Sequence, residues 1–258
     1  MSAIGTVRSA VKTARERQVT FMAAGVAFYA FMSLLPLLLL VLAVGTLVGG
    51  EELATAIVAQ FQDVLTDTGQ ELVVQALRDD AGRTTAGVVG VLTLTWGALK
   101  LFRSLTLAFA DLYGSTHSVS MLEQVRVGLT AIGAIVLATG LMVAVGAVVD
   151  VAAPDATLPF GRILGSLTLV AGIALALLPL YYVLPPVSVS AREVVPGALV
   201  AAVGWAALQG LFQVYAANAG QYQAYGVLGG VLLFLTWLYF AAVILLVGAV
   251  VNATLTAR

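Results

Sequence analysis

The sequence predicts an all-α integral membrane protein, a single membrane domain over residues 1–258 built as a bundle of about six transmembrane helices. The 258 residues are 61% hydrophobic and only 10% charged, whereas a soluble domain of this size covers its surface with many more charged side chains. The charges also gather in short stretches between apolar blocks. A helix needs roughly 20 apolar residues to cross about 30 Å of hydrocarbon, and several of these blocks are long enough.

Six apolar segments qualify as membrane crossings. We expect them within residues 19–48, 85–101, 127–149, 161–184, 194–217 and 225–251. The first is longer than one crossing needs and contains Pro36, and a proline inside a helix removes a backbone hydrogen bond. The main crossing is therefore expected near residues 34–48, and the stretch before Pro36 is either its extension or a separate re-entrant piece.

One substantial segment outside the membrane is expected between the first two crossings, over residues 51–83. Leu53, Ile57, Phe61 and Leu65 recur four residues apart, and a second apolar cluster follows. This spacing is typical of amphipathic helices. We therefore predict two short amphipathic helices, whose acidic faces lie in water.

The positive charges of the short connections predict the orientation, because they gather on the cytoplasmic side of membrane proteins. With the N-terminus inside, nine cations lie on the cytoplasmic side or at that interface and three lie outside. The nine are Arg8, Lys12, Arg15, Arg17, Lys100, Arg103, Arg126, Arg192 and Arg258, and the three are Arg78, Arg83 and Arg162. We therefore expect a cell-membrane protein with both termini and the basic residues 1–18 in the cytoplasm.

Residues for catalysis are scarce. The chain has no cysteine and a single histidine, His117. A hydrolytic metal centre needs several converging ligands, and only Asp111 and Glu123 stand near His117 as carboxylates, so this histidine is interpreted as a solvated loop residue. The sequence has neither a P-loop nor a G-x-S-x-G elbow, and its net charge of -1 argues against a nucleic-acid surface. We expect no enzyme activity, no metal, no cofactor and no nucleic-acid partner.

Polar and helix-breaking residues at membrane depth are the candidates for lining a cavity or a substrate path. These candidates are Tyr29, Ser33, Pro36, Gln209, Gln213, Tyr215 and Tyr225. Gln209 and Gln213 stand four residues apart and share one face of the fifth predicted helix. Carboxamides in a bilayer are costly unless they have a partner, so this face is expected to point into the bundle or into a wet cavity. Interhelical hydrogen bonding is the alternative interpretation.

Lys100 and Arg103 are the cations closest to the membrane, at the inner end of the second predicted helix. They either snorkel to the headgroups and fix the depth of the helix, or bind an anionic headgroup or cargo. Membrane lipids are the expected partners. Small residues in the helices permit a homo-oligomer without requiring one.

Several motifs in order resemble the YihY/BrkB family of integral membrane proteins. The first is AAGVAFYAFMSLLPLLLLVLAV near the N-terminus, and a closer match lies in the C-terminal third, with YYVLPPVSVSAREVVPGALVAA followed by LFQVYAANAGQYQAYGVLGGVLLFLTWLYFAAVILLVGA. The matching positions are Tyr29, Ser33, Pro36, Pro185, Arg192, Pro196, Gly197, Tyr215, Tyr225, Gly226, Trp237, Gly248 and Ala249. The chain departs from the family pattern at Val250, where an acidic residue is common, and near Ala110, where an asparagine is common.

The resemblance implies six membrane helices and no settled activity, because some family members carry a ribonuclease label and others are discussed as envelope transporters, including for lipids. The leading hypothesis is therefore a transporter or lipid-handling permease of unknown substrate. A ribonuclease is the disfavoured alternative. A third hypothesis is a scaffolding membrane protein that uses the acidic 51–83 segment as a docking surface.

Overall fold

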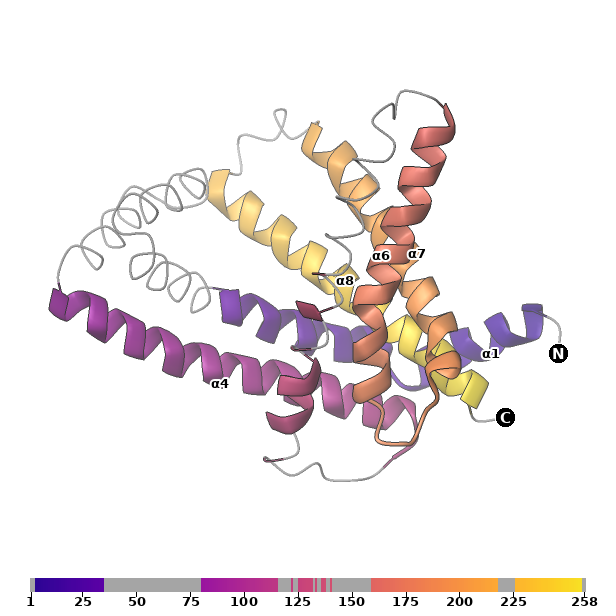
Figure 1. Cartoon of the computed structure of the whole chain (residues 1–258), viewed down its shortest axis with the longest axis horizontal. Coiled ribbons are helices and arrows are strands. Elements are labelled where there is room, and N and C mark those ends of the chain that lie inside the picture. The colour runs from indigo at the N-terminus through magenta and orange to yellow at the C-terminus, as the bar shows by residue number, and fades with distance from the viewer. Residues whose placement is uncertain are drawn as a thin grey trace. The chain divides into compact units, whose positions relative to one another are not determined.

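The computed structural model describes most of the expected helices. The described residues are 3–34, 80–115, 122, 125–131, 133, 136–137, 140, 159–217 and 226–256. All regular secondary structure in these ranges is helical (Figure 1), which confirms the all-α class. Pro36, His117, Tyr225 and residues 51–79 lie outside the described ranges, so the predicted count of six crossings stays a prediction.

The helices with named bounds follow the predicted order closely. They are α1 (Ala3–Glu16), a helix over Val19–Leu34, α4 (Asp80–Leu112), α6 (Pro159–Val183), α7 (Ala191–Ala217) and α8 (Gly226–Thr256). The last three begin and end within a few residues of the fourth, fifth and sixth predicted segments. Helical residues between 125 and 140 overlap the third predicted segment.

α4 differs most from its prediction, which was 85–101. Its first turn, Asp80–Arg83, comes from the segment expected outside the membrane, and its last turns extend beyond Arg103 to Leu112. In this extension Leu105, Ala108, Phe109 and Leu112 are buried. Their spacing is that of one helix face. A hydropathy pattern misses this part because the helix is amphipathic there and not apolar all round.

Two of the described helices are long and apolar enough to cross a membrane, α7 over Ala191–Tyr215 and α8 over Gly229–Thr256. In an apolar stretch of 18 residues, only 28% of α7 and 17% of α8 is buried. A core helix of a soluble protein would bury most of such a surface, so these exposed apolar faces are suited to lipid. Val19–Leu34 and Leu167–Val183 are shorter apolar helices.

The chain divides into two compact units. One comprises Met1–Val26, Phe102–Gln221 and Tyr239–Arg258, and the other comprises Ala27–Leu101 and Tyr222–Leu238. In the first unit, α6 packs against α7 (Figure 1). The largest fully buried side chains of the described residues all lie in this first unit: Phe109, Tyr181, Leu184, Val194, Leu246, Val250 and Asn252.

Local signals set the ends of two of these helices. Gly114 follows α4 with φ of 68°, and the amides of Gly114 and Ser115 donate to the carbonyls of Asp111 and Ala110. This is the Schellman arrangement, which favours glycine at the left-handed position. At the start of α7, the Ser190 amide donates to the Glu193 carboxylate at 2.7 Å, as in a capping box.

Candidate functional site

Two described helices come into backbone contact at Gly197 of α7 and Gly248 of α8. A Cβ atom added at Gly197 would collide with the carbonyl oxygen of Gly248, and one added at Gly248 would collide with the Gly197 carbonyl oxygen and the Tyr181 hydroxyl. Only a hydrogen atom fits at either position. Small residues let membrane helices approach to backbone contact in this way.

Asn252 binds α8 to the first turns of α7. It is fully buried. Its side-chain oxygen accepts a hydrogen bond from the Gly197 amide at 2.7 Å, and its side-chain nitrogen donates to the Val194 carbonyl at 3.1 Å. Both ends of the carboxamide therefore have backbone partners, as a buried polar group requires.

Tyr181 joins α6 to the same place. Its hydroxyl donates to the Leu245 carbonyl of α8 at 2.7 Å, and its ring centroid lies 6.0 Å from that of Phe109 in α4. We call Tyr181, Gly197, Gly248 and Asn252 the helix-crossing cluster. It fixes α6, α7 and α8 against one another by backbone contact and three hydrogen bonds.

Two members of the helix-crossing cluster, Gly197 and Gly248, are family-pattern positions, and Ala249 beside them is also buried. Sequence reasoning missed the other two as functional residues. Asn252 lies one residue beyond the predicted end of the sixth helix, although α8 continues to Thr256. Tyr181 shares the aromatic pair of the YYVLPP motif with the exposed Tyr182, and no pattern distinguishes the two.

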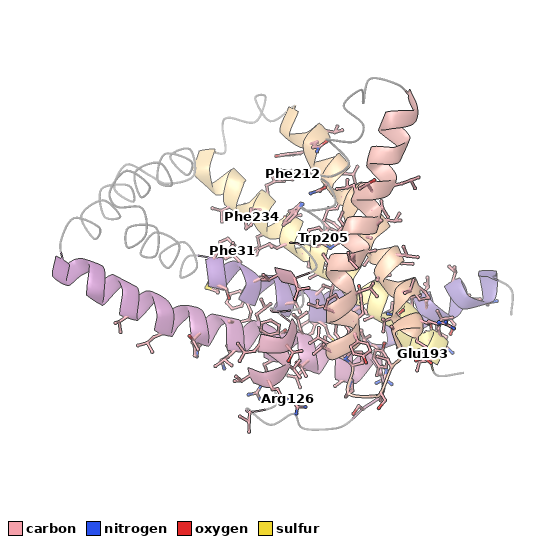
Figure 2. All side chains as sticks on the ribbon, viewed as in Figure 1. Phe31, Arg126, Glu193, Trp205, Phe212 and Phe234 are labelled. Atoms are coloured by element: carbon pink, nitrogen blue, oxygen red, sulfur yellow. The ribbon has the colours of Figure 1, made fainter. Side chains whose placement is uncertain are left out.

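Gln209 and Gln213, which we call the carboxamide row, lie on the later half of α7. Gln209, Gln213 and Tyr215 are all exposed in the first unit. Leu211 and Val214, between them, are 70% and 65% exposed. Trp205 and Phe212 of the same helix are labelled in Figure 2. The row is therefore a narrow polar stripe on the otherwise apolar and exposed later half of α7.

Tyr29 and Ser33, two of the predicted candidates for lining a cavity, belong to the second unit. The Ser33 hydroxyl donates to the Tyr29 carbonyl at 2.8 Å. A Cβ atom added at Gly97 of α4 would lie 2.8 Å from the Ser33 hydroxyl oxygen. Ser33 is thus in close contact with α4, which is the packing role of a small residue.

Aromatic side chains also pack together in the second unit. The Phe31 and Phe234 centroids lie 6.4 Å apart, and Phe234 stacks on Trp237 at 5.9 Å. Phe31 and Phe234 are labelled in Figure 2. Trp237, a family-pattern position, therefore takes part in aromatic packing.

Lys100 and Arg103 stand three residues apart along α4. The Lys100 ammonium lies 5.7 Å from the centroid of the Trp96 ring, which is 60% exposed, a cation–π arrangement. Arg103 is exposed. Because α4 continues to Leu112, these cations lie within a helix and not at its end. Their predicted contact with a headgroup stays a prediction.

Charged and polar groups gather where several helices of the first unit end. The Arg17 guanidinium, just after α1, lies 3.2 Å from the Asp111 carboxylate near the end of α4. Tyr113 follows α4, where burial and the nearby Glu193 carboxylate raise its pKa to about 12, so its hydroxyl stays protonated near neutral pH. Together with the Asn252 bonds, these contacts place the ends of α1, α4 and α8 and the start of α7 at one end of this unit.

Metal-ligating residues do not converge in the part of the chain that the structure describes: no group of three His, Cys, Asp or Glu there could hold a metal ion. His117 lies outside that part.

Residues 10–258 match the family model described as "Virulence factor BrkB". The chain belongs to this family. It is 28% identical to a UPF0761 membrane protein of Aromatoleum aromaticum over 90% of its length and 59% of the relative. It is also 27% identical to a UPF0761 membrane protein of Neisseria meningitidis serogroup B, over 93% of its length and 61% of the relative. The chain therefore spans about three fifths of these relatives.

A shorter match points to a differently named relative. The chain is 35% identical to the ribonuclease-like protein YfkH of Bacillus subtilis, over 31% of its own length and 29% of that protein. No solved structure matches the chain. The family match confirms the resemblance seen in the motifs, and with the exposed apolar helices it makes this chain a membrane protein.

Proposed function

We propose that this chain is a lipid-handling permease, in which the later half of α7 forms part of the path of an amphiphilic substrate. The observation that carries the proposal is the exposure of Gln209 and Gln213 on a helix long and apolar enough to cross a membrane. A carboxamide placed in hydrocarbon without a polar partner costs about 1–3 kcal/mol. The headgroup or ester oxygens of a passing lipid would provide such partners.

The surroundings of the carboxamide row fit an amphiphile better than a small polar solute. Successive residues are about 100° apart around a helix, so Gln209 and Gln213 share one face and Phe212 lies beside them. All three are exposed. A lipid could therefore place polar groups along the carboxamides and an acyl chain along the adjacent apolar surface.

Lipid movement in liposomes tests the proposal. We expect the purified chain, reconstituted into vesicles with a fluorescent phospholipid, to accelerate transfer between leaflets, read as fluorescence lost to an aqueous reductant. Gln209→Leu with Gln213→Leu removes two hydrogen-bonding groups of about 1 kcal/mol each, so the rate should fall roughly thirtyfold. Val214→Leu, an exposed change on the same helix, should leave it unchanged. A native chain that moves no lipid, or a double variant as fast as the native chain, contradicts the proposal.

We also propose that both termini face the cytoplasm. The ends of α1, α4 and α8 and the start of α7, which the charge distribution assigns to the inside, lie at one end of the first unit. Most of the described cations of this unit lie at that end or in α1. These cations are Arg8, Lys12, Arg15, Arg17 and Arg192. This common end supports the predicted orientation.

Cysteine labelling checks the orientation directly, because the chain has no cysteine of its own. Ser188→Cys, in the exposed connection between α6 and α7, should react with an impermeant thiol reagent only after the cells are permeabilised. Asp155→Cys lies between the third and fourth predicted crossings, which is outside when the N-terminus is inside, so it should react in intact cells. The opposite pattern would reverse the topology.

The two alternative functions have no observation in the described residues that favours them. The ribonuclease description belongs to a relative that aligns with 31% of this chain. Metal-dependent RNA cleavage that is lost in His117→Ala would favour it. The scaffolding hypothesis depends on residues 51–83, of which only Asp80–Arg83 are described, as the first turn of α4.

A further inference from the structure

α1 has three distinct faces. Val7 and Val11 stand four residues apart with Ala14 beside them, and Arg8, Lys12 and Arg15 repeat the same spacing one residue later. At about 100° per residue, the basic row therefore flanks the apolar row. Ser9 lies nearly opposite Val11. Apolar and basic rows side by side are typical of helices that lie in the headgroup region of a membrane.

The structure shows that the two valines are not packed against the other residues that it describes. Val7 and Val11 are 62% and 64% exposed. Among the side chains of this helix that the structure describes, the partly buried ones are instead Ala10, Thr13 and Ala14, which lie on the side of Val7 that faces away from Val11. Within the described part of the chain, one side of α1 is therefore in contact, and Val7, Val11 and the basic row are open.

α1 is separate from the helix that follows. Gln18 has φ of 50°, and the amides of Arg17 and Gln18 close the last turn of α1 on Thr13 and Arg15. The ion pair between Arg17 and Asp111 then ties this junction to the end of α4. Phe21, in the first turn of the next helix, is 76% exposed. The valine row of α1 and Phe21 are thus exposed apolar groups on either side of one anchored turn.

We infer that α1 is an interfacial helix that binds anionic phospholipid headgroups through Arg8, Lys12 and Arg15 and inserts Val7 and Val11 among the adjacent acyl chains. Charge complementarity identifies the occupant. The basic row is exposed, and among the described residues of α1 Glu16 is the one acidic side chain, paired with Lys12 at 3.7 Å. A protein partner would not require the basic row to run parallel to the apolar row, whereas a lipid surface does.

The inference extends beyond the proposed lipid movement and does not depend on it, because the depth of a side chain can be measured whether or not lipid crosses the membrane. Since the chain lacks cysteine, Val11→Cys provides a unique site for an environment-sensitive fluorophore or spin label. Ser9→Cys is the matched control on the opposite, exposed face of the same helix. The full chain is placed in nanodiscs of phosphatidylglycerol mixed with phosphatidylcholine, or of phosphatidylcholine alone.

In the anionic nanodiscs we expect the Val11 label to be protected from an aqueous quencher at least about fivefold relative to the Ser9 label. Protection should fall in phosphatidylcholine alone and in the variant that adds Arg8→Gln, Lys12→Gln and Arg15→Gln. These side chains are exposed, so the thermal unfolding midpoint should not change. Equal quenching of the Val11 and Ser9 labels overturns the inference. Protection that is the same in neutral lipid or in the triple variant also overturns it, since the valines would then be covered without any anionic headgroup.

Discussion

Gly248→Ala in α8 is expected to destabilise the protein by about 3 kcal/mol, toward the upper end of what overpacking costs. The added Cβ atom would collide with the Gly197 carbonyl oxygen and the Tyr181 hydroxyl. A backbone oxygen cannot rotate away as the end of a flexible side chain can. α7 and α8 would therefore have to move apart, which weakens the Asn252 hydrogen bonds as well. Gly197→Ala is expected to act in the same way from the α7 side.

Each helix provides a matched control. A Cβ atom added at Gly230 of α8 or at Gly210 of α7 meets no atom within 4 Å. Alanine is favoured over glycine inside a helix by about 0.5–1 kcal/mol, so Gly230→Ala and Gly210→Ala should be neutral or slightly stabilising. Reversible unfolding in mixed detergent micelles measures all four variants. If Gly248→Ala unfolds like Gly230→Ala, the two helices do not touch at this crossing.

The double variant gives a second measurement of the same contact. Once one alanine has separated α7 from α8, the second meets no opposing backbone oxygen. The cost of Gly197→Ala together with Gly248→Ala should therefore be well below the sum of the two single costs, by about 1 kcal/mol or more. Additive costs would mean that the two glycines pack against different neighbours.

Sequence reasoning found the long apolar helices because a bilayer requires nearly the same length of apolar chain from each of them. It failed where a helix is only half apolar. α4 continues past the predicted end at 101, with Phe109 and Leu112 buried and Arg103 exposed. Such a face can be recognised only when the helix that packs against it is known, because the same residues would suit an amphipathic helix at the surface.

The candidate site was also only partly predictable from the sequence. The residue types that stand out in an apolar sequence, such as Ser33 and Gln209, were found because polar groups at membrane depth need an explanation. Their roles could not be read from the pattern. Ser33 contacts Gly97 in α4, a packing role that depends on a helix far away in the sequence. Gln209 is exposed and is still a candidate for the substrate path. Interhelical packing and substrate binding use the same small and polar residues.

Asn252→Leu is expected to cost about 2 kcal/mol, because a buried donor or acceptor left without its partner costs about 1–3 kcal/mol. Leucine has the same number and branching of side-chain heavy atoms, although its methyl groups are bulkier, and it leaves the Gly197 amide without the carboxamide oxygen that it now meets at 2.7 Å. Thr254→Val is the control. The Thr254 hydroxyl donates within its own helix, to the Val251 carbonyl, so this change should cost less than about 1 kcal/mol.

In the same measurement, Tyr181→Phe should cost about 1 kcal/mol, whereas Tyr182→Phe should cost little because Tyr182 is 55% exposed.

The same variant separates a structural role of Asn252 from a functional one. Gln209 lies 12 residues along α7 from Gly197, which is about 18 Å at 1.5 Å per residue. A loosened crossing should therefore reduce the fraction of folded protein in reconstituted vesicles while lipid movement per folded molecule stays unchanged. The Gln209→Leu and Gln213→Leu pair should do the reverse, since both side chains are exposed. If Asn252→Leu stops lipid movement at full stability, the helix-crossing cluster is part of the path itself, and the assignment of the path to the later half of α7 is wrong.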